Sequence, residues 1–179
     1  MIRTRFASSD TRIIELQPTE WKRYKKLRLR SLKEEPVAFA ISWDEARKRS
    51  DKRWRAKLER ARRKFLKILV AEKKKNLIGL LEIHFDDRKK RLHLAKLRNF
   101  YVAIHFRGQG IGQMLIHKAL NFITKQRKGI KKIVLATNTP QRSAIALYKK
   151  SGFKIIGIAK KETRVGGKFY DQYLMEKIL

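Results

Sequence analysis

A glycine-rich segment near the middle of the chain offers the clearest chemistry. It follows an apolar, strand-like run and precedes apolar residues spaced as on a helix, and it consists of Arg107, Gly108, Gln109, Gly110, Ile111 and Gly112. Glycine allows tight turns, so several backbone N–H groups can converge in front of the positive end of the helix dipole. Such a loop favours phosphate or pyrophosphate. The segment therefore predicts an anion-binding site, with a ligand-free tight turn as the alternative.

Two familiar nucleotide-binding loops do not fit this segment. The dinucleotide fingerprint Gly-x-Gly-x-x-Gly requires glycine at position 113, where the chain has Gln113. The phosphate-binding P-loop requires Gly-Lys-Ser or Gly-Lys-Thr, and neither occurs in the sequence. Both classes of nucleotide site are therefore excluded.

The charge of the chain is strongly positive and unevenly distributed. Its 179 residues include 47 Lys and Arg against 16 Asp and Glu, a formal net charge of +31. From Arg88 to Lys161 there are 19 basic residues and no acidic one. A charge of this size indicates polyanionic partners, such as nucleic acid or a phosphorylated cofactor.

Other residue types exclude several kinds of site. The chain has no cysteine, which rules out disulfides and a cysteine nucleophile and agrees with a cytoplasmic location. The four histidines have no metal-ligand spacing, so no metal site is expected. No apolar run is long enough for a membrane span.

Hydrophobic periodicity predicts the elements that position the glycine loop. Helices are expected over 19–33 and 44–64, after Gly112, and over 140–150. Strands are expected over residues 11–17, 65–72, 77–85, 92–102, 132–137, 153–161 and 169–178. This order indicates an α+β fold, one sheet with helices on its faces, in a single domain spanning residues 1–179.

The predicted helix over 44–64 carries a second concentration of charge. Residues 47–64 include eleven basic and two acidic residues, while Trp54, Leu58 and Ala61 recur at helical spacing. The pattern is typical of an amphipathic helix with a solvated basic face. A nucleic-acid-binding helix is the alternative, because a basic face can follow phosphates.

Two spaced motifs resemble a known family. The segment 99–112, with Arg107, Gly110 and Gly112, is similar to the acetyl-CoA motif of the GNAT N-acetyltransferase superfamily. A second signature follows at the expected distance, comprising Asn138, Ala144, Leu147, Tyr148, Gly152 and Phe153. The resemblance covers nearly the whole chain. It implies a mixed, mostly antiparallel sheet of about seven strands flanked by about four helices.

The resemblance also implies a set of roles around acetyl-CoA. The N–H groups of the loop would bind the pyrophosphate, and the backbone of Tyr101 and Val102 would pair with the pantetheine arm. Asn138 would hydrogen-bond the same arm, Ser143 would add a further contact, and Tyr148 would point at the thioester sulfur. Tyr148 could act there as thiolate stabiliser or general acid, and nearby positive charge would lower its pKa. A tyrosine packed on an apolar helix face is the alternative.

The general base is less clear than the cofactor site. Many members of the resembled family carry a glutamate on the strand equivalent to 92–102, where this chain has Lys96 and Arg98. The leading candidate is Glu82 on the preceding strand. Glu34, Glu35, Asp171 and a water relay are the alternatives.

The expected function is acetyl transfer from acetyl-CoA to a primary amine by direct attack in a ternary complex. The acceptor could be a protein N-terminus, a lysine or a small amine, and a positive field disfavours polyamines. The alternative is a non-catalytic or bifunctional module that binds nucleic acid or the ribosome through its basic surface. A homodimer is possible.

Overall fold

The computed structural model describes residues 10–179, and one seven-stranded sheet runs through them. The strands lie in the order β1-β2-β3-β4-β5-β7-β6. Their bounds are β1 Thr11–Ile14, β2 Leu66–Lys73, β3 Asn76–Phe85, β4 Leu94–Val102, β5 Lys132–Asn138, β6 Lys154–Val165 and β7 Lys168–Ile178. Every neighbouring pair is antiparallel except β4 and β5, which are parallel. The mixed, mostly antiparallel α+β sheet is confirmed.

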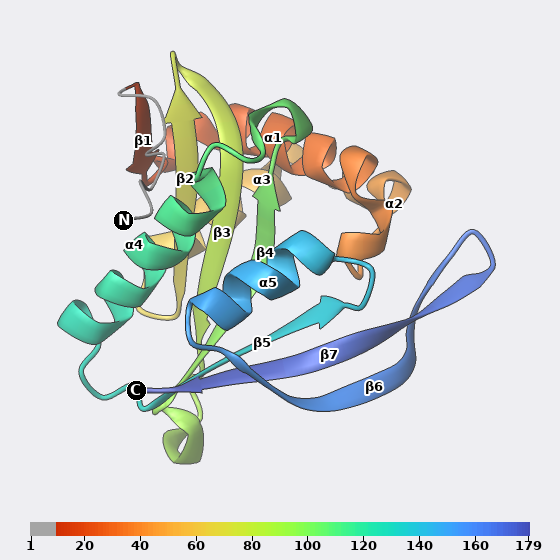
Figure 1. The fold of residues 1–179 in the computed structure, drawn as a ribbon. Helices are drawn as coiled ribbons and strands as arrows, with labels where there is room; N and C mark the ends of the chain where they lie inside the picture. The colour runs from red at the N-terminus through yellow and green to blue at the C-terminus, as the bar shows by residue number, and fades with distance from the viewer. Residues whose placement is uncertain (1–9) are drawn as a thin grey trace.

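Helices cover both faces of the sheet (Figure 1). One face carries α4 and α5, and the other carries α1, α2 and α3. Their bounds are α1 Trp21–Glu34, α2 Trp43–Arg47, α3 Asp51–Ala61, α4 Ile111–Gln126 and α5 Arg142–Lys150. Side chains alternate along β2, so Leu69 packs under α4 while Ile68 and Val70 pack under α1 and α3.

The basic helix expected over 44–64 is broken into two. Ser42 caps α2 and Ser50 caps α3, each accepting a hydrogen bond from a backbone N–H group three residues later. Within α3, Trp54 and Leu58 are buried as the spacing predicts. The prediction of a single helix over 44–64 was therefore wrong, because Ser50 caps the start of a new helix. That helix, α3, ends at Ala61 rather than at residue 64.

Further boundaries differ from expectation, and the strand expected over 11–17 ends at Ile14. The helix expected from residue 140 begins at Arg142, with Gln141 at its N-cap. The strand expected over 153–161 continues to Val165 and joins β7 through Gly166 and Gly167, whose φ values are +55° and +82°. This long β6–β7 hairpin extends away from the helices (Figure 1).

The parallel pair β4–β5 separates along its length. The strands pair only at Leu94–Lys132, Ala95–Ile133 and Lys96–Val134, although β4 continues to Val102 and β5 to Asn138. The backbone of β4 beyond Lys96 therefore has no strand partner on its β5 side within the described chain. We call this separation the splay. It leaves an opening in the sheet between β4 and β5, where a ligand could enter.

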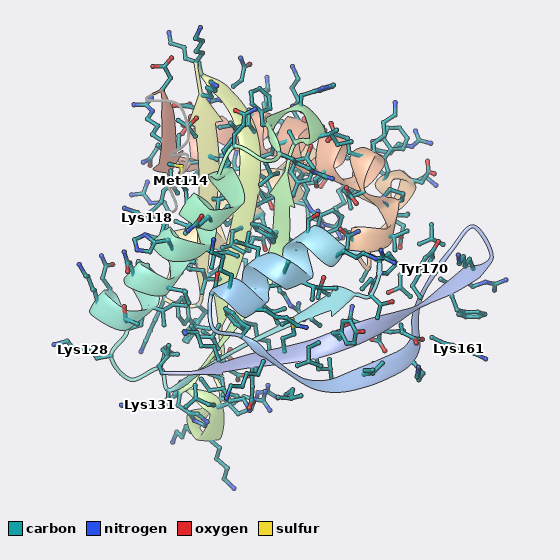
Figure 2. All side chains as sticks on the ribbon, in the orientation of Figure 1. Met114, Lys118, Lys128, Lys131, Lys161 and Tyr170 are labelled. Atoms are coloured by element: carbon teal, nitrogen blue, oxygen red, sulfur yellow. The ribbon has the colours of Figure 1, made fainter. Side chains whose placement is uncertain are left out.

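Exposed basic side chains occur on several elements. Figure 2 shows Lys118, Lys128 and Lys131 projecting outward near α4 and Lys161 on the β6–β7 hairpin, and all four are exposed. In the described part of the chain, none of the helices combines the length and apolar character needed to cross a membrane.

Candidate functional site

The splay begins beside a bulge in β4. Leu80 of β3 pairs with Tyr101 and Glu82 with Arg98, so two residues of β4 face one of β3. Asn99, one of the two, has φ = +53°, and its side-chain oxygen accepts a hydrogen bond of 2.9 Å from the Arg28 guanidinium. The bulge turns the end of β4 away from β5 and towards the glycine loop.

The glycine loop turns through two left-handed residues and leads into α4. Gly108 and Gly110 have φ values of +74° and +80°, which residues other than glycine rarely adopt. The N–H of Met114 donates to Gly110 O, while the amides of the preceding three residues have no acceptor among residues 10–179. These free donors at the N-terminus of a 16-residue helix fit an anion such as a pyrophosphate.

Gly112 is required by close packing. A Cβ atom at this position would lie 3.0 Å from both Leu147 of α5 and Phe100 of β4. Glycine thus lets the start of α4 approach both elements, which places the glycine loop beside the splay.

The guanidinium of Arg107 braces the loop. It donates to Val102 O at 3.0 Å and to the Glu35 carboxylate at 2.5 Å. Glu35 also accepts from Gln141 at 3.1 Å, just before α5. One carboxylate at the end of α1 therefore connects both sides of the splay.

Glu34 makes a parallel connection. It accepts hydrogen bonds from the Tyr101 hydroxyl at 2.6 Å, from Ile104 N at 3.1 Å and from Arg30. Burial and the bond to Glu34 raise the pKa of Tyr101 above its usual range. The Tyr101 side chain therefore points away from the splay, and only its backbone is available there.

Asn138 lies at the end of β5, on the opposite side of the splay. Its amide nitrogen donates to Val37 O and to Thr163 Oγ1, and its oxygen accepts from Gln172 at 3.0 Å. Ser143 is exposed on the first turn of α5. A ligand contact by Asn138 would have to replace one of these internal bonds.

Tyr148 is buried on α5 between two aromatic rings. Its ring centroid lies 5.6 Å from that of Phe100 and 6.0 Å from that of Phe153. Burial raises the pKa of Tyr148 well above its usual range, instead of the lowering that the nearby positive charge led us to expect. The hydroxyl therefore stays protonated, which suits a hydrogen-bond donor better than an acid.

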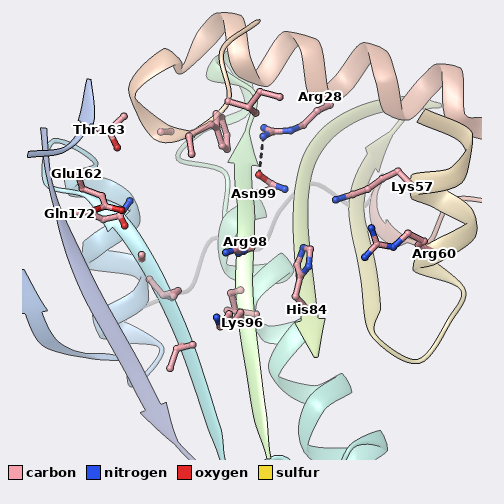
Figure 3. A pocket seen from close by; sticks show the side chains of 18 of the residues that line it. Arg28, Lys57, Arg60, His84, Lys96, Arg98, Asn99, Glu162, Thr163 and Gln172 are labelled. Atoms are coloured by element: carbon pink, nitrogen blue, oxygen red, sulfur yellow. Dashed lines mark hydrogen bonds between the residues drawn. The ribbon is translucent and has the colours of Figure 1, made fainter. Parts of the chain in front are cut away.

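A cavity of about 870 Å³ opens on the other face, between α3 and the β5–β7 part of the sheet. Figure 3 shows Lys57 and Arg60 reaching from α3, Lys96 and Arg98 rising from β4, and Glu162 on the opposite wall. Its apolar lining includes Val134, Ala136 and Leu174. The cavity and the glycine loop thus lie on opposite faces of the same splayed strands.

Glu82 is fully buried beneath this cavity and is saturated with donors. The Tyr24 hydroxyl donates at 2.7 Å, Lys57 Nζ at 2.8 Å and His84 Nε2 lies at 2.8 Å. Burial opposes ionisation, but the hydrogen bond from His84 and the charges of Lys57 and His84 outweigh it and hold the pKa of Glu82 well below its usual range. Of this group, Tyr24, Lys57 and His84 line the cavity.

The remaining carboxylates named as candidate bases are all engaged. Glu34 and Glu35 hold the splay, and Asp171 pairs with Lys160 at 2.9 Å and with the backbone N–H of Lys161. Over residues 10–179, no group of three or more His, Asp or Glu side chains gathers as a metal site would require.

The structure gathers Tyr101, Val102, residues 107–112 and Tyr148 around the splay. Sequence reasoning missed the part that α3 plays in the cavity wall. The spacing of Arg53, Lys57 and Arg60 was a usable signal, because positions i, i+4 and i+7 share one helix face.

Comparison with known proteins identifies the class. Residues 27–153 match the Acetyltransferase (GNAT) family model, and the chain belongs to this family. It is accordingly an acyltransferase of the GNAT N-acetyltransferase class.

Two curated relatives are N-acetyltransferases. An L-amino acid N-acetyltransferase of Escherichia coli is 29% identical over 129 residues, covering 72% of this chain and 77% of that protein. Human N-acetyltransferase 8 is 38% identical over 92 residues, which is 49% of this chain but only 38% of that protein. The match thus spans well under half of the human relative.

Two solved structures share the fold. An acetyltransferase of the GNAT family from Streptococcus pneumoniae has a TM-score of 0.85 at 22% identity, covering 94% of this chain and 99% of that one. A Salmonella typhimurium structure, solved with its cofactor acetyl-CoA, has a TM-score of 0.77 at 16% identity, covering 96% of this chain and 95% of that one.

Proposed function

We propose that this chain transfers the acetyl group of acetyl-CoA to a primary amine by direct attack within a ternary complex. The observation that carries the proposal is the position of the splay, open to the glycine loop on one face and to the cavity on the other. Two substrates could therefore approach the end of β4 from opposite sides.

The cofactor would be held mainly by backbone groups. The free N–H groups at the start of α4 would bind the pyrophosphate of acetyl-CoA, with Gly108, Gln109, Gly110, Ile111 and Gly112 forming the loop around it. The end of β4, at Tyr101 and Val102, has no strand partner on its β5 side among the described residues and would pair there with the amides of the pantetheine arm. Asn138 and Ser143 would contribute from the β5–α5 side.

The transfer step needs a neutral amine. Its nitrogen lone pair attacks the thioester carbonyl carbon, the carbon–sulfur bond breaks with its electron pair on sulfur, and one amine proton is released. The thiolate takes up one proton, so the products are an acetamide and the free thiol. A backbone N–H near Val102 would stabilise the oxyanion, and the Tyr148 hydroxyl would stabilise the departing thiolate.

Glu82 has no exposed surface and its pKa is held well below its usual range, so it would orient His84 rather than take up the amine proton itself. His84 contacts Glu82, lines the cavity and has a side chain that is 27% exposed, so it offers a route for the proton. A water molecule in the cavity is the alternative relay.

The outer surface of α3 and the residues just after it support a second candidate, binding to nucleic acid or the ribosome. Lys52, Arg55 and Arg63 are exposed and do not line the cavity. A steep fall of RNA affinity with salt would support this role beside acetyl transfer.

We also retain one domain over residues 1–179, a homodimer and a cytoplasmic location as proposals.

The direct test is an acetyl-transfer screen with the purified chain. Acetyl-CoA is incubated with peptide N-termini, lysine peptides, polyamines and free L-amino acids, the last suggested by the Escherichia coli relative. Product is detected by mass spectrometry and thiol release. The proposal expects transfer to one amine class and thermal stabilisation by acetyl-CoA, and absence of both would overturn it.

A further inference from the structure

The cavity opposite the glycine loop is lined by far more positive than negative charge. Eight Lys and Arg side chains line it, whereas Glu162 is the one carboxylate among the described residues that does so. Arg53, Lys57 and Arg60 stand on one face of α3, and Lys96 and Arg98 on one face of β4.

Several of these cations have no partner within the chain. Lys57 is paired with Glu82, Arg91 with Asp86, and Arg28 bonds Asn99. By contrast, five side chains make no hydrogen bond or ion pair to any of residues 10–179: Arg49, which lies over the Trp54 ring, and Arg53, Arg60, Lys96 and Arg98. Like charges gathered on one surface repel, so they do not stabilise the fold. Their arrangement instead favours an anionic ligand.

The spacing of the cations indicates the size of that ligand. Arg53 and Arg60 are seven residues apart on α3, which corresponds to about 10 Å along the helix. An extended peptide advances about 3.3 Å per residue, so three or four residues would span the pair. The cavity volume of about 870 Å³ leaves room for such a segment.

The same field bears on which amine can react. A free α-amino group has a pKa of about 7.7–8.0, against about 10.4 for lysine. Nearby positive charge lowers either value. Because the α-amino group starts closer to neutrality, it needs the weaker base, which suits a cavity above Glu82, a carboxylate that is buried and fully bonded.

We propose that the cavity binds the N-terminus of a polypeptide with Asp or Glu among its first three or four residues. Arg53, Arg60, Lys96 and Arg98 would select this acceptor by pairing with its carboxylates, while Val134, Ala136 and Leu174 contact its main chain. The proposal rests on the proposed acetyl-transfer function for its chemistry, but its recognition step can be measured alone.

The test compares two charge reversals of equal size, one on α3 and one at a position of α3 and a position just after it. The variant Arg53→Glu/Arg60→Glu changes the cavity wall, and Arg55→Glu/Arg63→Glu changes exposed positions outside it. Acetylation is measured with an acidic peptide, a lysine-rich peptide of equal length and free glutamate. We expect the acidic peptide to be preferred at least tenfold. Its kcat/KM should fall at least thirtyfold in the cavity variant and less than threefold in the matched control.

Binding is measured in parallel without turnover. Fluorescence anisotropy of the acidic peptide, labelled at its C-terminus, reports recognition even if no acetyl group is transferred. The inference survives a failed transfer assay if the acidic peptide still binds and the cavity variant alone loses it. Thermal melting confirms folding, and Arg53→Gln/Arg60→Gln replaces the reversal if that variant does not fold.

Three results would overturn the inference. The first is equal use of the acidic and lysine-rich peptides. The second is acetylation of free glutamate as efficiently as the peptide, which would assign the cavity to a small amino acid. The third is loss of RNA binding in the cavity variant with unchanged peptide binding, which would assign the cations to nucleic acid.

Discussion

The two faces of the splayed sheet use positive charge in different ways. On the α4–α5 face, the proposed anion site would consist of backbone N–H groups held by glycine, and the one guanidinium in the loop, Arg107, is paired with Glu35. On the α1–α3 face, charged side chains line an open cavity and several lack partners among residues 10–179. The net charge of +31 exceeds what one cofactor would require, and eight of the 47 Lys and Arg side chains line the cavity where an acceptor would be chosen.

The largest effect is expected at Glu82, which anchors the cavity face. Replacing Glu82 by Gln removes a buried charge on which Tyr24, Lys57 and His84 converge. The free energy of unfolding should fall by about 3 kcal/mol, measured by urea denaturation. Glu162→Gln is the control, with an expected change below about 0.5 kcal/mol.

The stability of the native chain and that of the Glu82→Gln variant should also depend differently on pH. The folded-state pKa of Glu82 lies below its ordinary value of 4.5, so its stabilisation is complete above about pH 4.5 and is lost as the pH falls towards the folded-state pKa. The stability difference between the native chain and Glu82→Gln should therefore shrink below pH 4.5. A difference independent of acid would mean that the charge of Glu82 is not what stabilises this face.

Tyr148 tests the chemistry of the other face. Tyr148→Phe keeps the packing against Phe100 and Phe153 but removes the hydroxyl. We expect kcat to fall about 100-fold with little change in KM or melting temperature, measured by thiol release. Tyr170→Phe on β7 is the control. Unchanged kcat would leave Tyr148 as a packing residue.

The glycine loop comes next. Gly110→Trp places a bulky side chain at a left-handed position and in front of the free N–H groups. Acetyl-CoA should bind at least tenfold more weakly by calorimetry. Gly129→Trp is the matched control, since a Cβ atom at that position has no neighbour within 4 Å. Equal affinity in both variants would remove the loop from the cofactor site.

The smallest effect is expected at Arg107. Its ion pair with Glu35 is 44% exposed on the arginine side, and such pairs contribute less than about 1 kcal/mol. Arg107→Leu should weaken acetyl-CoA binding less than threefold, since the backbone rather than the guanidinium would hold the pyrophosphate. A loss as large as that of Gly110→Trp would mean that a side-chain charge, and not the backbone N–H groups, binds the anion on the α4–α5 face.

Local patterns predicted most of the fold. The polar residues between β2 and β3, the apolar stripe of α4 and the glycines at 108, 110 and 112 act over a few residues, so their structure is readable from the sequence. The fold family followed because two such local motifs stand at a fixed separation.

Long-range contacts account for what was not predicted. Glu82 meets Tyr24 and Lys57 across 58 and 25 positions, and Asn138 bonds Val37 across 101, none of which spacing along the chain reveals. The basic face of α3 was recognised as a charge pattern, but its direction depends on how Trp54 and Leu58 pack beneath it. Whether that face meets solvent or a cavity is decided only by the assembled sheet.

Glu35 has a consequence for how the molecule is built. It joins Arg107 and Gln141, which lie 72 and 106 positions away along the chain. Contacts between such distant residues require large loops to close first, so they form late in folding. The strands on each side can pair earlier through short hairpins, while the gap between β4 and β5 acquires its final width only when the end of α1 arrives. The opening for ligands should therefore be the last part of the molecule to assemble and the first to loosen when it unfolds.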